Sequence, residues 1–463
     1  MSAGKELLPA GLGDAVEQAT GTTIAGVKPR GGGGASRQGA ELVLEAPGGA
    51  RTDAYMNYDV HRAGAGDDQA FAREAAILEA LSGPLAGRGV RTARFIAALP
   101  EQRALIMGKV AGEANFNLVR DPAERLRLSR DLMAQVAALH AMDANAVPAL
   151  GPAGSVTDQI RGRIAAARAR DARAGGDPLV HLALDWLEKH VPPEPARRVI
   201  VHGDVGAGNF LFDGGEVTAL LDWELVHVGD PMADLAMLCL RDLFMPMVPL
   251  PQLFAAYEEA GGAAVEIDRI RFWRLLFQTG FVAGARTLDP KAPPPPNLGM
   301  NMVFGMVHRR VLAEALAEAS GVPLPPVALP EAPPGALDRS FAIALDDLRD
   351  VIVPRLGDQQ AAVKAKGLAR LVKWWQAHAR YGAAYAEAEL GELNAALGTQ
   401  HHDVEAARAE VHRRVVDGSM APERAIPLAY ARVTRETALM AGAMGSFAGT
   451  RFSPLTESAT CDA

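Results

Sequence analysis

The sequence has 463 residues, a formal net charge of −8, 49% hydrophobic residues and only 5% aromatic residues. An acidic chain with few aromatic side chains lacks the basic surface and the stacking platforms that nucleic-acid binding requires, so we expect no nucleic-acid partner. The hydrophobic content is typical of globular proteins, and at about 100–200 residues per domain the length allows two to four compact units.

The cysteine content and the apolar runs bear on the compartment. Two cysteines, Cys239 and Cys461, cannot build a disulfide framework, and we expect Cys239 to be a buried thiol because it lies in an apolar run. No apolar stretch is long enough to span a bilayer, and the first ten residues lack the apolar run of a secretory signal. These features predict a cytoplasmic protein without a membrane partner, and they leave the oligomeric state open.

The first part of the chain predicts a β-rich lobe with one main helix. The predicted strands are 24–27, 41–45, 53–60, 95–98 and 104–107. A run of four glycines at 31–34 separates the first two strands. Between the third and fourth strands, apolar residues of 69–81 repeat at helical spacing.

Helices dominate beyond residue 110. The predicted helices are 126–142, 155–173, 179–190 and several between 234 and about 319, with short strands at 199–201, 210–212 and 217–221. The proline-rich stretch 321–335 predicts a linker, and helical patterns resume after it. We therefore predict an α+β protein with a small β-rich lobe, a mainly helical lobe, a linker and a separate all-α domain, at 1–110, 111–320, 321–336 and 337–463.

Polar side chains follow two neighbouring apolar strands between 199 and 236. Asp204 comes after the strand 199–201, at the start of a glycine-containing loop, where a carboxylate can accept the proton of a hydroxyl group. Asn209 lies five positions later, and Asp222 ends the next apolar strand. Amide and carboxylate oxygens suit Mg²⁺, which keeps few protein ligands beside waters and phosphate oxygens. Polar residues also collect in turns, but that explains each residue singly and not two buried strands that both end in a carboxylate.

The same segment resembles the aminoglycoside phosphotransferase and choline kinase superfamily, whose members are similar to protein kinases in fold. The resemblance is carried by HGDVGAGN, LDWE and GDPMADLA, extends over about residues 15–320 and is strongest over 199–240. It implies a bilobal protein-kinase-like fold, Mg²⁺, and ATP or GTP as phosphoryl donor. Asp204 matches the catalytic base of the family, and Asn209 and Asp222 match its metal ligands.

Two further residues match positions that brace the catalytic loop of the family, His202 within the loop and Asp234 at the start of the following helix. Glu224 lies two residues after the second metal ligand. It either assists the metal through a water molecule or is a solvated side chain.

The β-rich lobe carries the matches to the nucleotide site. The glycines 31–34 and Ser36 resemble the phosphate-binding loop of the family, because a glycine-rich turn lets backbone amides approach phosphate closely; the alternative is a surface turn. Glu74 matches the helix glutamate that pairs with a lysine or arginine on a strand, or it is a solvated helix residue. Gly108 and Val110 match the hinge whose backbone groups meet adenine.

One expected residue is missing. The strand that should carry the basic partner of Glu74 reads DAYMNYDV, and Met56 and Asn57 occupy the expected positions. Loss of a cation over the phosphates weakens nucleotide positioning, so a catalytically impaired, kinase-like scaffold protein stays open as an alternative. The nearby basic residues that could substitute are Arg51, Arg62 and Lys109.

The amino-acid sequence of the motif most resembles that of superfamily members linked with acyl-CoA metabolism, some of which phosphorylate 4-hydroxyacyl-CoA thioesters. The resemblance therefore implies a small-molecule alcohol as substrate, with a CoA thioester as the first candidate and an aminoglycoside or choline-like alcohol as alternatives. Arginines of the helix 155–173 could bind CoA phosphates, but a basic run is more often a solvated face. These arginines are Arg161, Arg163, Arg168, Arg170 and Arg173. We interpret the pair His401-His402 as part of a loop.

Overall fold

The computed structural model describes residues 4–30, 37–59, 65–151, 154–285 and 297–456. The chain folds into two compact units that alternate along the sequence. The first unit takes the described residues of 1–156, 194–270 and 453–463, and the second takes those of 157–193 and 271–452. The domain boundaries that we drew from the sequence stay predictions.

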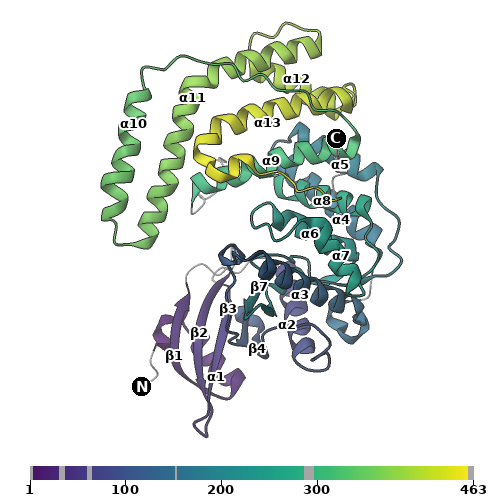
Figure 1. Ribbon diagram of the computed structural model, residues 1–463, viewed down its shortest axis with the longest axis vertical. Helices are drawn as coiled ribbons and strands as arrows, with labels where there is room; N and C mark the ends of the chain where they lie inside the picture. Colours follow the sequence, from purple (N-terminus) through teal and green to yellow (C-terminus); the bar gives the residue numbers. More distant parts are fainter. Residues whose placement is uncertain (1–3, 31–36, 60–64, 152–153, 286–296, 457–463) are drawn as a thin grey trace. The chain divides into compact units, whose positions relative to one another are not determined.

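A five-stranded sheet forms the N-terminal part of the first unit, with antiparallel neighbours in the order β1-β2-β3-β5-β4 (Figure 1). The strands are β1 Thr23–Arg30, β2 Gln38–Glu45, β3 Arg51–Tyr58, β4 Phe95–Leu99 and β5 Ala104–Gly108. The two helices of this region are α1 Leu12–Thr20 and α2 Ala65–Ser82. With the helical remainder of the chain, this sheet confirms the α+β fold class.

The two faces of β3 have different environments because successive side chains of a strand point to opposite sides. Met56 is fully buried and packs in a hydrophobic core that includes Leu12 and Val16 of α1. Tyr55 and Asn57 lie on the opposite face and line a cavity. Of the two positions where the sequence lacks the expected cation, Asn57 therefore faces the cavity and Met56 does not.

The rest of the first unit consists of helices around two small β-ribbons, in which β6 pairs with β9 and β7 pairs with β8. The strands are β6 Val199–Val201, β7 Phe210–Asp213, β8 Glu216–Leu220 and β9 His227–Gly229. The helices are α3 Pro122–Ala141, α6 Pro231–Asp242 and α7 Leu250–Glu259, and α8 Ile267–Val282 begins in this unit and continues into the second. Backbone bonds of 2.9 and 3.0 Å between Glu113 and Phe212 join the chain after β5 to the β7–β8 ribbon.

The second unit is helical, and its longest helix, α11, packs against α13 (Figure 1). Its elements are α4 Val156–Arg173, α5 Pro178–Lys189, α9 Leu298–Ser320, α10 Asp338–Asp346, α11 Gln359–Leu397, α12 Val404–Val416 and α13 Pro422–Met444. The sequence predicted helical structure over 337–395. The structure has two helices there, α10 and α11, with irregular helical turns at 347–355 between them, where Pro354 cannot donate a backbone hydrogen bond. None of the described helices combines the length and the apolar character needed to cross a membrane.

Candidate active site

A cavity of about 880 Å³ in the first unit collects most of the residues that the sequence predicted for the site. Its walls come from β1 to β3, from α2, from the segment after β5, from the loops after β6 and β8, and from α6. The predicted site residues on these walls are Glu74, Gly108, Val110, Asp204, Asn209 and Asp222.

The loop after β6 is fixed by a buried carboxylate. Asp234 of α6 accepts hydrogen bonds from the backbone N–H groups of His202 (2.9 Å) and Gly203 (2.8 Å), and its Oδ2 lies 3.0 Å from Nε2 of His140. Burial alone would raise the pKa of Asp234, but these hydrogen bonds outweigh it and lower the pKa below the usual range. Gly203 has a φ of +89°, and a Cβ there would lie 2.6 Å from the carbonyl oxygen of Leu225, so this turn requires glycine.

His202 supports the loop from inside the core. Its Nδ1 accepts the backbone N–H of Asp204 at 3.2 Å, so the ring proton is on Nε2, which donates to the carbonyl oxygen of Leu221 at 3.0 Å. Burial lowers the pKa of the fully buried His202, which keeps the ring neutral. Both ring nitrogens are used within the protein, so we assign His202 a positioning role.

Asp204 is held on both of its carboxylate oxygens. Nε of Arg241 donates to Oδ1 at 2.8 Å, a second guanidinium nitrogen donates to Oδ2, and Asn209 Nδ2 donates to Oδ2 at 2.8 Å. Because Asn209 uses its Nδ2 toward Asp204, its Oδ1 is the atom left for a cation. Sequence reasoning missed Arg241, although it lies seven residues after Asp234 and therefore on the same face of α6.

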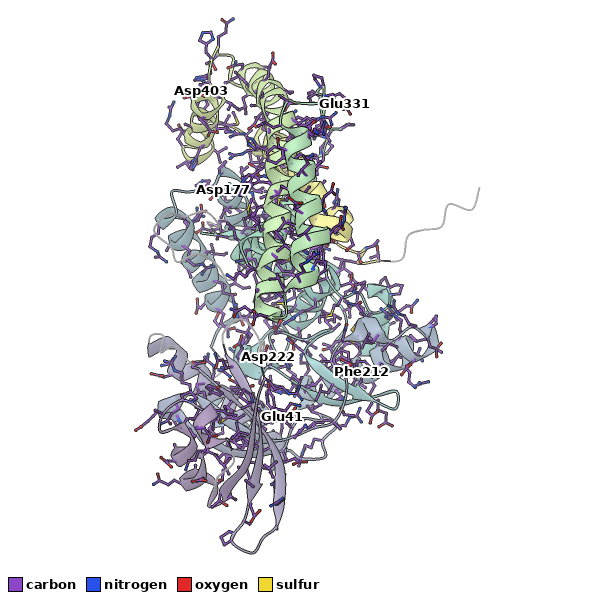
Figure 2. All side chains as sticks on the ribbon, turned by 90° about the vertical axis from the view of Figure 1, so that its left-hand side faces the viewer. Glu41, Asp177, Phe212, Asp222, Glu331 and Asp403 are labelled. Carbon is purple, nitrogen blue, oxygen red and sulfur yellow. The ribbon has the colours of Figure 1, made fainter. Side chains whose placement is uncertain are left out.

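Asp222 follows β8 by two residues (Figure 2) and adopts a φ of +64°, which is uncommon outside glycine and typical of functional sites. The backbone N–H of Leu221 donates to the carbonyl oxygen of Asn209 at 2.9 Å, which ties the two polar segments together. Partial burial in the cavity raises the pKa of Asp222 to about 6, and the negative charges of Glu224 and Asp204 add to this increase. Solvent still reaches the Asp222 side chain. Carboxylates grouped in this way favour a bound cation.

The donor atoms of this cluster fit Mg²⁺. Among the described residues, no three His, Cys, Asp or Glu side chains are grouped to hold a metal by themselves. Asn209 and Asp222 instead offer two hard oxygen ligands on the wall of an open cavity. This arrangement matches Mg²⁺, which takes one or two protein ligands together with waters and phosphate oxygens.

Glu74 has a basic partner that the sequence did not predict. Nη1 of Arg37 lies 2.6 Å from Oε2 of Glu74, and Nε of Arg37 lies 3.5 Å from Oδ1 of Asp59. Burial raises the pKa of Glu74 to about 7, and the charge of Arg37 opposes this increase. Only 3% of Glu74 is exposed, so its interpretation as a solvated helix residue is wrong.

The substitutes that the sequence offered for the missing strand cation do not contact Glu74 in the described structure. Arg51 forms an exposed ion pair with Glu45, and Lys109 lines the cavity but pairs with Glu41 at 3.1 Å. Arg62 lies outside the described residues. Arg37 takes this place from the segment just before β2, where it directly follows the glycine-rich loop.

Of the three remaining residues that the sequence predicted for the nucleotide site, the structure describes Gly108 and Val110. Gly108 and Val110 line the cavity, but the N–H of Gly108 donates to the carbonyl oxygen of Arg94 at 2.7 Å and is not available to a base. Val110 is therefore the better candidate for a backbone N–H contact. Ser36 lies outside the described residues.

The arginine-rich helix predicted at 155–173 is α4 of the second unit. Arg168 pairs with Asp185 and Glu188 at 2.9 Å each, and Arg170 donates to the carbonyl oxygen of Gly280 at 3.2 Å. Arg168 and Arg170 thus stabilise the helical unit itself, which favours the structural interpretation for these two residues, whereas Arg173 lines a cavity of the second unit.

Comparison with known proteins identifies relatives of the chain. Residues 52–273 match the family model described as "Phosphotransferase enzyme family". A stretch of 137 residues is 34% identical to acyl-CoA dehydrogenase family member 11 of Gallus gallus, over 28% of this chain and 17% of that protein. A stretch of 73 residues is 41% identical to acyl-CoA dehydrogenase family member 10 of Mus musculus, over 15% of this chain and 7% of that protein.

The chain thus matches about a fifth or less of the length of these curated relatives. Among solved structures, a macrolide 2'-phosphotransferase of Brachybacterium faecium is similar with a TM-score of 0.43 and 21% identity, over 68% of this chain and 99% of that one. An aminoglycoside phosphotransferase mutant in complex with ADP and hygromycin B is similar with a TM-score of 0.42 and 16% identity, over 59% of this chain and 91% of that one.

Proposed function

Because residues 52–273 match the model of the phosphotransferase enzyme family, we propose that this chain transfers a phosphoryl group from ATP to a hydroxyl group of a small molecule with Mg²⁺ as cofactor. One observation carries the proposal. Asp204, Asn209 and Asp222 come from two chain segments and line one cavity together with the Arg37–Glu74 ion pair.

Each residue has a distinct task in this proposal. Asp204 accepts the proton of the substrate hydroxyl, and Arg241 fixes the orientation of the Asp204 carboxylate. Asn209 and Asp222 hold the Mg²⁺ ion, which when bound offsets the charge of the phosphates. Arg37, oriented by Glu74, supplies the cation over the phosphates that β3 lacks. Since phosphoryl transfer depends on alignment and charge stabilisation, these residues suffice for the reaction.

A hydroxyacyl-CoA thioester is the acceptor that we propose. The support is sequence similarity, since several of the matched stretches belong to proteins named acyl-CoA dehydrogenase family members 10 and 11. Val110 provides the backbone contact to adenine, and GTP is the alternative donor. The cytoplasmic location stays a prediction.

A catalytically impaired binding protein is the second candidate, because Asn57 places an uncharged group where a strand cation is expected and Arg241 occupies both oxygens of Asp204. In this case the cavity binds nucleotide and no phosphoryl group is transferred. Arg37 argues for the enzyme, since it restores a cation at this wall of the cavity.

Replacement of Asp204 by Asn separates the two candidates. General bases contribute about 10²- to 10⁴-fold to rate, so Asp204→Asn should lower turnover at least about 100-fold in an ADP-release assay with hydroxyacyl-CoAs, amino alcohols and aminoglycosides. Binding of Mg–ATP, followed by calorimetry, should change little. Asp213→Asn, an exposed carboxylate at the end of β7, is the matched control. Undiminished turnover by Asp204→Asn would refute the assigned base, and absence of turnover in the wild-type protein with every acceptor would favour the binding protein.

A further inference from the structure

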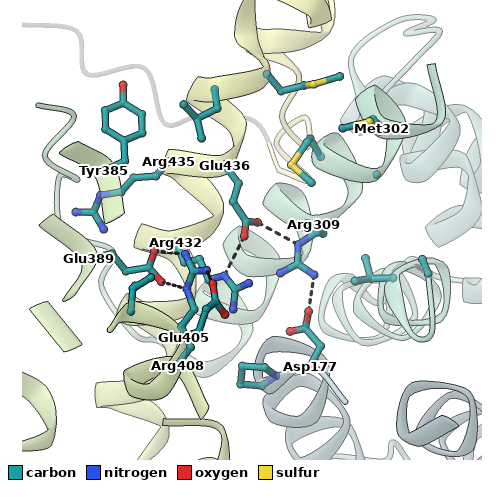
Figure 3. A pocket seen from close by; sticks show the side chains of 18 of the residues that line it. Asp177, Met302, Arg309, Tyr385, Glu389, Glu405, Arg408, Arg432, Arg435 and Glu436 are labelled. Atoms are coloured by element: carbon teal, nitrogen blue, oxygen red, sulfur yellow. Dashed lines mark hydrogen bonds and ion pairs between the residues drawn. The ribbon is translucent and has the colours of Figure 1, made fainter. Parts of the chain in front are cut away.

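The second unit contains a large cavity of its own. It has a volume of about 1240 Å³ and is lined by residues of α4, α5, α8, α9, α11, α12 and α13 (Figure 3). Small-molecule sites typically have volumes of about 300–1,000 Å³, so this cavity has room for a sizeable ligand. All of its lining residues belong to the second unit, which makes it a separate site from the cavity around Asp204.

The cavity is elongated along α11. Trp374 and Glu389 both line it, and at 1.5 Å per helical residue they are separated by roughly 22 Å along the helix axis. The apolar side chains of the lining include Trp374 of α11, Met302 and Met306 of α9 and Met440 of α13.

Another part of the lining is a cluster of ion pairs (Figure 3). Arg309 of α9 pairs with Asp177 and lies 3.6 Å from Glu436 of α13, and Arg408 of α12 pairs with Glu389 of α11. Burial opposes the charge of Arg309, but Asp177 and Glu436 raise its pKa above the usual range, so it stays a cation. In Figure 3 Met302 lies to one side of this charged cluster.

The charged side chains of the lining are five arginines and four carboxylates. Within the part of the chain that the structure describes, Nε of Arg435 is a buried side-chain atom of the lining without a hydrogen-bond partner, and Nε of Arg309 makes no hydrogen bond but lies 3.6 Å from Oε2 of Glu436. Both are donors, because a guanidinium group carries N–H groups and no acceptor. Leaving a buried donor unpaired is unfavourable, so a ligand that brings oxygen acceptors and negative charge is favoured over a cationic one.

From these observations we propose that the second unit binds an elongated amphiphile in this cavity, with a carboxylate or phosphate head group near Arg309 and Arg435 and an aliphatic chain along the methionine and tryptophan side chains. The apolar part gains affinity by removing methylene groups from water. The acidic head accepts the N–H group at Nε of Arg435, while the existing ion pairs keep the guanidinium groups in place. This site does not depend on the phosphotransferase reaction, so either proposal can fail while the other stands.

Calorimetric titration of the full chain with octanoate, decanoate and dodecanoate tests the site. We expect affinity to rise about fourfold per added methylene, as burial of the chain requires. Dodecyl phosphate distinguishes a phosphate ligand from a carboxylate ligand, and dodecanol should bind at least about tenfold more weakly than the better of the two acids. Failure of both acids to bind, or equal binding of dodecanol, would overturn the proposal.

Two variants locate the ligand. Arg309→Gln should weaken binding of the acid at least about tenfold and leave dodecanol binding unchanged, whereas Arg424→Gln, an exposed arginine on α13 outside the lining, should change neither. Met306→Trp fills space beside the apolar side chains of the lining and should reduce binding of dodecanoate more than that of octanoate. If Arg309→Gln does not fold, Met306→Trp still tests whether the ligand binds in this cavity. Wild-type affinity in Met306→Trp, or in a folded Arg309→Gln, would refute this location.

Discussion

Replacing Arg37 with Met tests the ion pair that substitutes for the missing strand cation. Glu74 is buried, and burial raises its pKa from the ordinary value of 4.5 to about 7. A raised pKa means that the folded state binds the proton more tightly, so the contribution of Glu74 to stability is complete below pH 4.5 and is lost as the pH rises to 7. At about 1.4 kcal/mol per pKa unit, the wild-type protein loses on the order of 3 kcal/mol over this range.

Without Arg37, the pKa of Glu74 rises further and the loss continues above pH 7, at up to about 1.4 kcal/mol per pH unit. Arg37→Met should therefore destabilise the protein little at pH 6 and by more than about 1 kcal/mol at pH 8. A buried carboxylate that stayed charged without its partner would instead cost about 3–5 kcal/mol at both pH values. Protonation of Glu74 thus limits the loss of folding stability that Arg37→Met causes at low pH.

Urea unfolding of nucleotide-free protein between pH 5.5 and 8.5 measures this difference. Arg51→Met removes an exposed ion pair with Glu45 and serves as the control, with an effect that should not depend on pH in this range. Lost packing of the Arg37 side chain adds a constant offset, so the slope against pH is the informative quantity. A difference between Arg37→Met and wild type that is equal at pH 6 and pH 8 would refute the assignment of Glu74 as the group that Arg37 neutralises.

Two further predictions concern the cavity. Asn57→Lys in the Arg37→Met background should raise kcat/KM for ATP by at least about tenfold in the ADP-release assay, because it returns a cation to the cavity face of β3; Met56→Lys faces the core and should not do so. Gly203→Ala should lower stability by about 1–3 kcal/mol in thermal unfolding, since its φ of +89° and the Leu225 carbonyl oxygen leave no space for Cβ. Gly214→Ala is the control for the steric contact, because Gly214 also has a positive φ of +57° but a Cβ there meets open space; an equal loss in both variants would contradict a role for the Leu225 contact.

The half of the candidate site after β6 was predictable because its residues are close in sequence. A buried strand, a glycine-containing loop and a second strand bring Asp204, Asn209 and Asp222 to one cavity without reference to the rest of the chain. Arg37 was not predicted because its pairing with Glu74 depends on how the segment before β2 packs against α2. The strand alternation that sends Met56 to the core, by contrast, could have been derived from the period of two.

Other features depend on packing that a single sequence does not reveal. Arg241 shares a helix face with Asp234, but its contact with Asp204 requires the loop to approach α6. The cavity of the second unit is built from seven helices whose sequence positions extend from 173 to 440. The sequence indicated helical structure in each of these regions, whereas it did not reveal the space that the helices enclose.

Because the two units alternate along the chain, truncation at a single position cannot separate them. The second unit takes 157–193 from the middle of the chain, and its border with the first falls within α8, between Ile270 and Arg271. A truncation in the proline-rich segment would remove α11, α12 and α13 but leave their packing partners α5 and α9 attached to the first unit, with apolar side chains newly uncovered. A catalytic fragment that ends near residue 320 should therefore be prone to aggregate, and aggregation of such a fragment would say nothing about whether the first unit can bind nucleotide.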